Sequence, residues 1–247
     1  MMLEARGLRK SFGALEVTRD VSVALPAGAR HAVVGPNGSG KTTLFNLLTG
    51  ELPVDAGAIR LDDRDVTHLP PDARARAGLT RSFQKNNLFP DLSVFDNLAL
   101  AVTIGARHGH VFWRRFHGLP RLYDRVADLA ARIHVAGQLD HIVRTLPYGT
   151  QRQVEIGLAL AVGPKVLLLD EPTAGMSAEE TRAMTALIAG LPRDIALLII
   201  EHDMDVVFEI AERITVLDYG SVLIEGTPEE VRSSELVRRR YLGEAPA

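Results

Sequence analysis

The fold of this chain is decided by residues 35–43, which read Gly35-Pro36-Asn37-Gly38-Ser39-Gly40-Lys41-Thr42-Thr43. A strand-like segment at 30–34 runs into this stretch, and a helical pattern begins directly after it. The three glycines let the backbone curl so that successive N–H groups point inward, and the start of the helix adds a partial positive charge. The stretch is therefore predicted to be a phosphate-binding loop between a strand and a helix.

The residues after the last glycine of this loop carry side chains suited to a nucleoside triphosphate. Lys41 can reach the β- and γ-phosphate oxygens, and the Thr42 hydroxyl can ligate the Mg²⁺ that accompanies them. A glycine-rich turn between a strand and a helix can also be purely structural. The complete G-x-x-x-x-G-K-T string in this context favours phosphate binding.

The composition is that of an ordinary globular protein, with 46% hydrophobic and 24% charged residues in a chain of 247. The net charge of −3 gives no indication of nucleic-acid binding, and the absence of cysteine excludes disulfides, thiolate metal sites and cysteine nucleophiles. The first residues form no apolar secretory segment, and the longest apolar runs, such as 195–200, are too short to span a bilayer. We expect a cytoplasmic protein whose membrane association depends on partners.

The order of strand and helix patterns predicts an α/β fold with a P-loop (RecA-like) nucleotide-binding core and an N-terminal antiparallel β segment. Residues 3–6 and 21–25 alternate as half-buried strands do. Within a single domain of 1–247, the core is expected over 1–83 and 164–226, a helical subdomain over 84–163, and a helical tail over 227–247. Helices are expected over 123–136 and after the capping residues Ser93, Ser177 and Thr227.

An insertion at 105–119 lies between two of the expected helices. It holds Trp113, Arg114, Arg115 and three histidines. We interpret it as a solvated insertion whose aromatic residues pack locally. A contact with a partner or with the membrane surface is the alternative.

Two strand-like segments end in residues with catalytic side chains. The apolar run at 165–169 ends at Asp170 and Glu171, and the run at 195–200 ends at Glu201 and His202. Ligands of open α/β sheets bind at the carboxyl ends of the strands. There, Asp170 can hold Mg²⁺ through its water shell, Glu171 can polarise the attacking water, and His202 can donate to the γ-phosphate. The alternative is that the acids cap a turn and the histidine is structural.

In this order the motifs resemble those of the ATP-binding subunits of ABC transporters, over nearly the whole chain. The series consists of the phosphate loop, Gln84, the segment Leu146-Pro147-Tyr148-Gly149-Thr150-Gln151, Asp170, Glu171 and His202. The resemblance implies an ATPase that uses ATP and Mg²⁺, in which Gln84 senses the metal and couples to the membrane partner. It implies that the signature segment, 146–151, reaches the nucleotide held by the opposite subunit. It also implies that Phe12 stacks on adenine, whereas the sequence around Phe12 alone favours a core position.

Further segments are similar to the branch of this family that imports branched-chain amino acids and related amides. They are residues 79–84, the insertion near Trp113, residues 171–176 and the ending at 241–244. The similarity implies integral membrane permease subunits as partners, a substrate-binding protein as an indirect partner, and a location on the inner face of the cell membrane. A lipopolysaccharide-export ATPase is a near relative and an alternative. A soluble ABC-type switch without transport and a kinase or GTPase with the same loop are rivals of other classes.

Two residues depart from the family pattern at the expected dimer interface. The common signature begins Leu-Ser-Gly-Gly-Gln, and Pro147 stands in place of the serine, which removes a hydroxyl and a backbone N–H. Gly149 and a helix beginning at Thr150 still offer backbone donors. Ser177 stands where many relatives carry aspartate. Because the signature acts on the partner's nucleotide, we expect a heterodimer with a second ATP-binding subunit, with a homodimer as the alternative.

Overall fold

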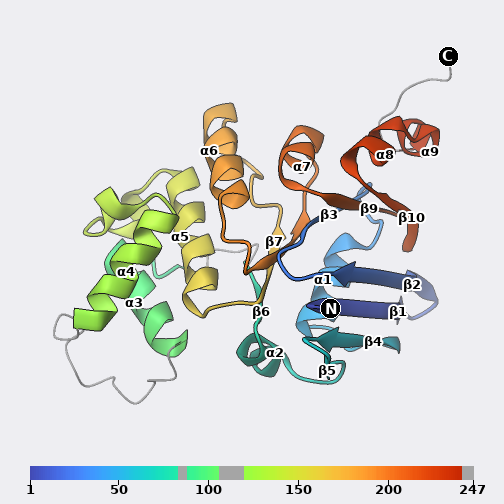
Figure 1. The fold of residues 1–247 in the computed structure, drawn as a ribbon, viewed down its shortest axis with the longest axis horizontal. Helices are drawn as coiled ribbons and strands as arrows, with labels where there is room; N and C mark the ends of the chain where they lie inside the picture. The colour runs from blue at the N-terminus through green and yellow to red at the C-terminus, as the bar shows by residue number, and fades with distance from the viewer. Residues whose placement is uncertain (83–87, 106–119, 241–247) are drawn as a thin grey trace. The chain divides into compact units, whose positions relative to one another are not determined.

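The computed structural model describes residues 1–82, 88–105 and 120–240 (Figure 1). The chain divides into two units. Unit 1 comprises Met1–Thr80, Lys165–Glu171 and Pro192–Ala247, and unit 2 comprises Arg81–Pro164 and Pro172–Leu191. Residues 172–191, which the sequence placed within the α/β core, therefore group with the helical unit, and the described part of the tail groups with unit 1.

A six-stranded sheet in the order β10-β9-β3-β8-β7-β6 contains the strand that leads into the phosphate loop. Its strands are β3 (Arg30–Val34), β6 (Leu79–Arg81), β7 (Val166–Asp170), β8 (Ala196–Ile200), β9 (Arg213–Asp218) and β10 (Ser221–Gly226). The pairs β3–β8, β3–β9 and β7–β8 are parallel, and every residue of β3, β7 and β8 is buried. Continuous apolar runs suit strands that are covered on both faces.

The expected N-terminal antiparallel segment is a four-stranded sheet in the order β2-β1-β4-β5. It consists of β1 (Leu3–Phe12), β2 (Leu15–Leu25), β4 (Ala56–Leu61) and β5 (Arg64–Asp65). The first two strands are longer than the alternating segments at 3–6 and 21–25 indicated. Register shifts along the β1–β2 pair, between Ala5 and Leu8 and again on either side of Lys10, break the alternation of side chains.

The helices of unit 1 are α1 (Lys41–Thr49), α2 (Pro71–Ala77), α7 (Met204–Ile210), α8 (Pro228–Ser233) and α9 (Glu235–Arg240). Helix α1 directs Leu44, Phe45 and Leu48 into a core that also contains Leu168 of β7 and Leu198 of β8. The helix expected after Thr227 begins there, and Thr227 and Glu230 form a capping box. It is split into α8 and α9, because Ser234 between them has an extended backbone.

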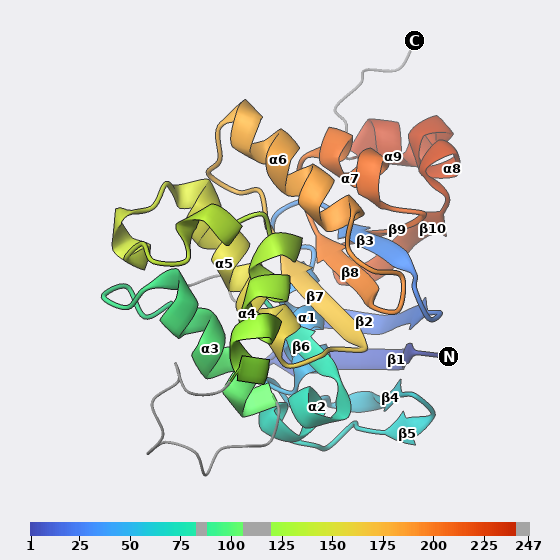
Figure 2. The ribbon, with the colours of Figure 1, turned by 60° about the vertical axis from the view of Figure 1, so that its left-hand side comes forward.

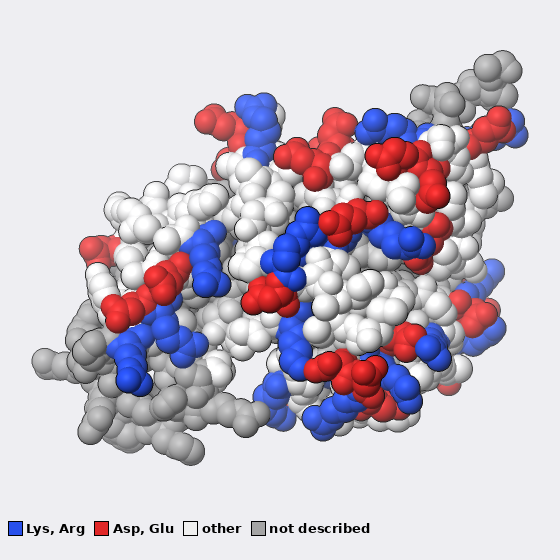
Figure 3. Space-filling model, in the orientation of Figure 1, with Lys and Arg blue, Asp and Glu red and all other residues white. Residues whose placement is uncertain are grey.

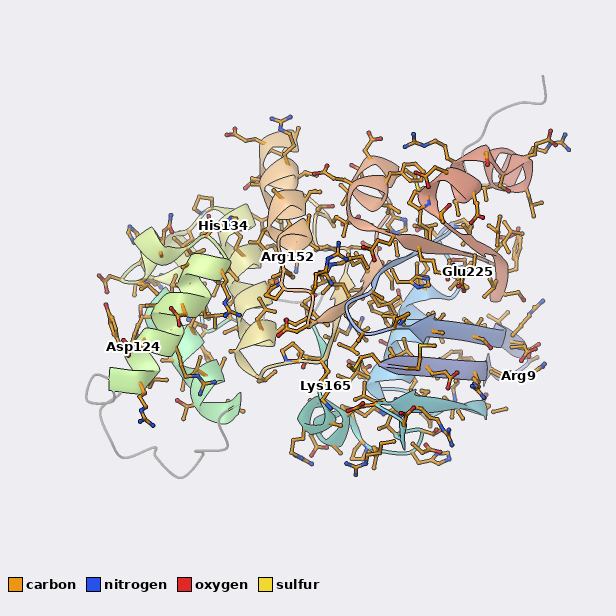
Figure 4. The ribbon with its side chains drawn as sticks, viewed as in Figure 1. Arg9, Asp124, His134, Arg152, Lys165 and Glu225 are labelled. Atoms are coloured by element: carbon orange, nitrogen blue, oxygen red, sulfur yellow. The ribbon has the colours of Figure 1, made fainter. Side chains whose placement is uncertain are left out.

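Polar side chains of three neighbouring strands of the six-stranded sheet contact one another. His31 on β3 is 1% exposed, and its Nε2 lies 2.8 Å from the Thr215 hydroxyl on β9, which in turn lies 3.3 Å from a carboxylate oxygen of Glu225 on β10 (labelled in Figure 4). Burial lowers the pKa of His31 to about 4, so the ring is neutral near pH 7. At the surface, positive and negative side chains are interspersed on the face shown in Figure 3.

Unit 2 is helical, as predicted, and contains α3 (Val94–Gly105), α4 (Pro120–Arg132), α5 (Tyr148–Ala161) and α6 (Ala178–Ala189) (Figure 2). Short 3₁₀ turns lie at Ala136–Gln138 and Val143–Thr145. The Ser93 hydroxyl accepts the Asp96 N–H at 3.0 Å, so the predicted cap of α3 is confirmed. The helix expected over 123–136 ends at Arg132 instead, because His134 adopts a left-handed conformation and the Val135 N–H turns back to the Ala130 carbonyl.

None of the helices in the described part of the chain is long and apolar enough to cross a membrane.

Candidate functional site

The phosphate loop has the backbone that its glycines were predicted to permit. Gly35 has φ 149°, and a Cβ there would lie 2.2 Å from the Leu217 carbonyl oxygen. Gly40 has φ 102°, and its Cβ would lie 2.8 Å from the Val17 carbonyl oxygen. Both conformations and both close approaches exclude a larger residue. The loop is therefore enclosed by backbone from β2 and β9 as well as by its own turn.

Lys41 lies inside this loop. Its Nζ donates to the carbonyl oxygens of Gly35 at 2.7 Å and Pro36 at 2.9 Å. Burial lowers the pKa of Lys41, while the nearby carboxylates of Glu171 and Asp170 raise it. A buried ammonium group whose hydrogen bonds go to two neutral carbonyls is well matched to a phosphate, because charged oxygens accept stronger hydrogen bonds than carbonyls do.

The turn between β9 and β10 also supports the loop, and the sequence patterns did not identify this role. The Gly220 N–H donates to the Ser39 carbonyl at 3.1 Å, and the Arg19 N–H donates to the Gly220 carbonyl at 2.6 Å. The Ser39 hydroxyl is buried and has no hydrogen-bond partner among the described residues. Nothing local in the sequence related Tyr219-Gly220 to the loop.

The structure brings Glu171 and His202 together. The register of β7 against β8 aligns Asp170 with Ile200, so the two strands end at the same edge of the sheet. There the Glu171 carboxylate oxygen Oε1 lies 2.6 Å from His202 Nε2. Asp170, which precedes the pair, is 2% exposed.

Glu171 has a left-handed backbone, with φ 48°. Its N–H donates to the Ile200 carbonyl at 2.9 Å, which holds the first residue after β7 against the end of β8. A non-glycine residue in this region costs on the order of 1 kcal/mol and is characteristic of functional sites. No sequence pattern indicated this conformation.

Phe12 is placed at the end of β1 and is 48% exposed, so the interpretation as a core residue was wrong. The ring follows the register shift at Lys10–Ser11 and precedes the turn at Gly13, where the strand has left the core. Lys10 Nζ lies 5.8 Å from the ring centroid and is held by Asp55 at 2.7 Å. The ring is accessible to a planar ligand.

The signature segment begins helix α5 in unit 2. The helix starts at Tyr148 rather than at Thr150, because the Pro147 carbonyl already accepts the Gln151 N–H at 3.0 Å and Pro147 acts as the N-cap. The Gln151 amide donates to the Leu146 carbonyl at 2.9 Å. Arg152 (labelled in Figure 4) donates to the Tyr148 hydroxyl at 3.0 Å and to Glu155 at 2.7 Å, which fixes the first turn of the helix.

Some predicted residues lie outside the described part of the chain. They are Gln84, residues 106–119 of the insertion and the ending at 241–244. Thr42 is exposed and Thr43 half-buried in the first turn of α1. The described residues contain no group of three or more His, Asp or Glu side chains that could hold a metal ion without other ligands.

A phosphate loop followed by an acid pair and a histidine at strand ends is typical of P-loop nucleotide-binding proteins. Comparison with known proteins identifies the family within this class. A family model described as ABC transporter matches residues 18–174. The chain belongs to the ATP-binding proteins of the ABC transporter family and is an ATPase of that family. The resemblance predicted from the motifs is confirmed.

Curated relatives are similar along nearly the whole chain. The high-affinity branched-chain amino acid transport ATP-binding protein LivG of Salmonella typhimurium is 38% identical over 256 residues, covering 99% of this chain and 98% of LivG. BraF of Pseudomonas aeruginosa, which carries the same description, is 36% identical with the same coverage. The lipopolysaccharide export system ATP-binding protein LptB of Escherichia coli is 36% identical over 244 residues, covering 98% and 97% of the two chains.

Solved structures confirm the predicted α/β nucleotide-binding fold. An ATP-binding cassette of an ABC transporter in its ADP conformation superimposes with a TM-score of 0.85 and 26% identity, covering 98% of this chain and 99% of that chain. A nucleotide-free cassette superimposes with a TM-score of 0.80 and 25% identity, covering 98% and 95%.

Proposed function

We propose that this chain hydrolyses Mg·ATP at the loop of unit 1 and that the reaction energises import of branched-chain amino acids or related amides through partner membrane subunits. The observation that carries the hydrolytic part is the contact of Glu171 with His202 at the strand edge that Asp170 also occupies. Relatives described as branched-chain amino acid transport proteins support the substrate class.

The residues of the loop bind and orient the phosphates. Lys41 exchanges its two carbonyl acceptors for phosphate oxygens, and the N–H groups at the start of α1 face the same anion. Phe12 offers its exposed ring to the adenine. Magnesium, when bound, neutralises charge that develops on the phosphates. The donor set fits it, because Mg²⁺ takes one or two protein oxygens, here Thr42 and Asp170, and completes its shell with water and phosphate.

Glu171 is proposed to accept a proton from the attacking water, and His202 to donate to the γ-phosphate. Their direct contact holds both side chains at the strand edge, so each orients the other. Gln84 is proposed to sense the metal and to couple the site to the membrane partner.

The proposed assembly pairs two ATP-binding subunits on the inner face of the cell membrane, with permease subunits and, indirectly, a substrate-binding protein. A heterodimer is favoured because Pro147, the N-cap of α5, lacks the hydroxyl that a serine would offer to the partner's nucleotide. The proposal leaves this chain's own phosphate site with its loop, Lys41 and Glu171. Turnover should therefore occur at the site that contains Lys41 and Glu171 when a partner with a serine signature faces it.

The transport proposal is tested by gentle detergent extraction of this subunit from its native membranes, followed by identification of the proteins recovered in stoichiometric amount. We expect two different multispanning proteins and a second ATP-binding subunit. Recovery of lipopolysaccharide-export components would show that the substrate is lipopolysaccharide rather than an amino acid, which is the alternative that the similarity to LptB supports. Recovery of soluble proteins alone would overturn the transport function and leave the ATPase chemistry intact.

The heterodimer is tested by Pro147→Ser in the recovered complex, with turnover measured separately at each nucleotide site. The restored hydroxyl is expected to raise turnover at the partner's site and to leave the site with Lys41 unchanged. Equal turnover before and after the substitution would refute the argument from Pro147.

A further inference from the structure

Glu180 makes two sets of hydrogen bonds at once. In the capping box of α6, its Oε2 accepts the Ser177 N–H at 3.0 Å and the Ser177 hydroxyl at 2.8 Å. Its other oxygen, Oε1, accepts the backbone N–H of Gly149 at 3.0 Å. Gly149 is the second residue of α5, so this N–H is one of the groups that the helix itself leaves unpaired.

The contact depends on the absence of a side chain at position 149. A Cβ on Gly149 would lie 2.9 Å from Glu180 Oε1, 3.0 Å from its Cγ and 3.2 Å from its Cδ. A second approach occurs nearby, where a Cβ on Gly175 would lie 3.7 Å from the Tyr148 ring. The start of α5 and the segment that leads into α6 are therefore joined within unit 2, with the Glu180 carboxylate between them.

The carboxylate is charged at neutral pH. Hydrogen bonds from the backbone and hydroxyl of Ser177, followed by the Gly149 N–H, lower the pKa of Glu180. An anion therefore already occupies the donor that Gly149 presents, at the start of a helix of 14 residues.

We propose that Glu180 is a positioning residue that competes with the partner-bound γ-phosphate for the Gly149 N–H and so sets how readily ATP draws the two subunits together. This inference rests on the proposed function, in which the signature segment contacts the opposite nucleotide. An N–H shared between two acceptors gives each a weaker hydrogen bond, and two anions beside it repel each other. Glu180 must therefore release Gly149 before the phosphate is held, while its other oxygen keeps Ser177 in place.

The test is Glu180→Gln in the detergent-extracted complex, with KM for ATP and kcat measured separately. Glutamine keeps the capping box, because its amide oxygen can still accept from Ser177, but it removes the charge that opposes phosphate. KM is expected to fall about threefold to tenfold, as removal of one repulsive charge near a surface predicts, with kcat within about twofold. The matched control is Glu179→Gln, an exposed acid in the same first turn of α6, which should leave KM unchanged.

Glu180→Asp provides a second variant that keeps the charge and the cap but shortens the side chain by one methylene. It should also lower KM, because its carboxylate no longer reaches Gly149. A purely structural role predicts an unchanged or higher KM in both variants, and that result would overturn the inference. If the unsubstituted complex shows no ATP turnover, the proposed function fails as well, whereas normal turnover with an unshifted KM in the variants refutes the role of Glu180 alone.

Discussion

Arg74 supports the phosphate loop from the far end of α1. It is 2% exposed, and its guanidinium donates to four backbone carbonyls. Nη1 donates to Leu47 and Leu48 at 2.6 Å each, Nη2 donates to Thr67 at 2.7 Å, and Nε donates to Leu69 at 2.9 Å. The first two carbonyls belong to the last turn of α1, where a positive charge also complements the helix dipole.

The substitution Arg74→Met keeps an unbranched apolar stem and removes the guanidinium. The Leu47 carbonyl keeps a second donor, the Gly50 N–H at 3.3 Å. The other three carbonyls lose the donor that Arg74 supplies, at a cost of about 1 kcal/mol each at the low end of the range for unsatisfied buried groups. The expected loss is therefore about 3 kcal/mol in the free energy of unfolding. For a chain of this size that corresponds to a decrease in Tm of roughly 6–12 °C.

The assay is urea unfolding of the purified chain, followed by circular dichroism, with Arg76→Met as the matched control. Arg76 lies on the same helix, and its ion pair with Asp72 is exposed at both ends, so its loss should change stability by no more than about 0.5 kcal/mol. A decrease below about 1 kcal/mol for Arg74→Met would refute the argument that the carbonyls depend on this side chain.

Three further predictions concern the site and the sheet beneath it. Glu171→Gln should bind ATP with little change but lower kcat at this site by about 10²-fold or more, because it removes the proton acceptor; retained turnover in a single-site assay would contradict that role. Lys41→Ala should weaken ATP binding at least tenfold in calorimetry, since it removes the one ammonium group inside the described loop. The pKa of His31 is about 4 in the folded chain and 6.5 unfolded. The free energy of unfolding should therefore be unaffected by His31 above about pH 6.5 and fall by about 3 kcal/mol as the pH decreases to 4. Urea unfolding across this range should show a flatter profile for His31→Gln, and an unchanged slope would exclude His31 as the cause.

The sequence predicted those parts of the fold that local chemistry determines. The phosphate loop, the helix caps at Ser177 and Thr227 and the buried parallel strands all depend on short patterns, and the structure contains each of them. The end of α4 was missed because a histidine, rather than a glycine, takes the left-handed position after it. The start of α5 was misplaced by two residues because Pro147 can serve as an N-cap whose carbonyl begins the helix.

The predicted site residues could be identified, but the contacts between them could not. Glu171 and His202 were candidates from their places at strand ends, yet only the pairing of β7 with β8 determines that their side chains meet. Phe12 was interpreted as a core residue because the register shift at Lys10 has no local signature. The contact of Glu180 with Gly149 joins residues 31 positions apart and depends on the missing Cβ, which no periodic pattern records.

The turn at Tyr219–Gly220 has a consequence for how the protein is made. The loop at 35–43 emerges early during synthesis, but β3, which leads into it, lies between β8 and β9, and Gly220 holds the Ser39 carbonyl. A ribosome that has added only the first two hundred or so residues has therefore not yet supplied the turn that completes the loop. Affinity for nucleotide should arise late in translation, and a fragment ending before β9 should not acquire it.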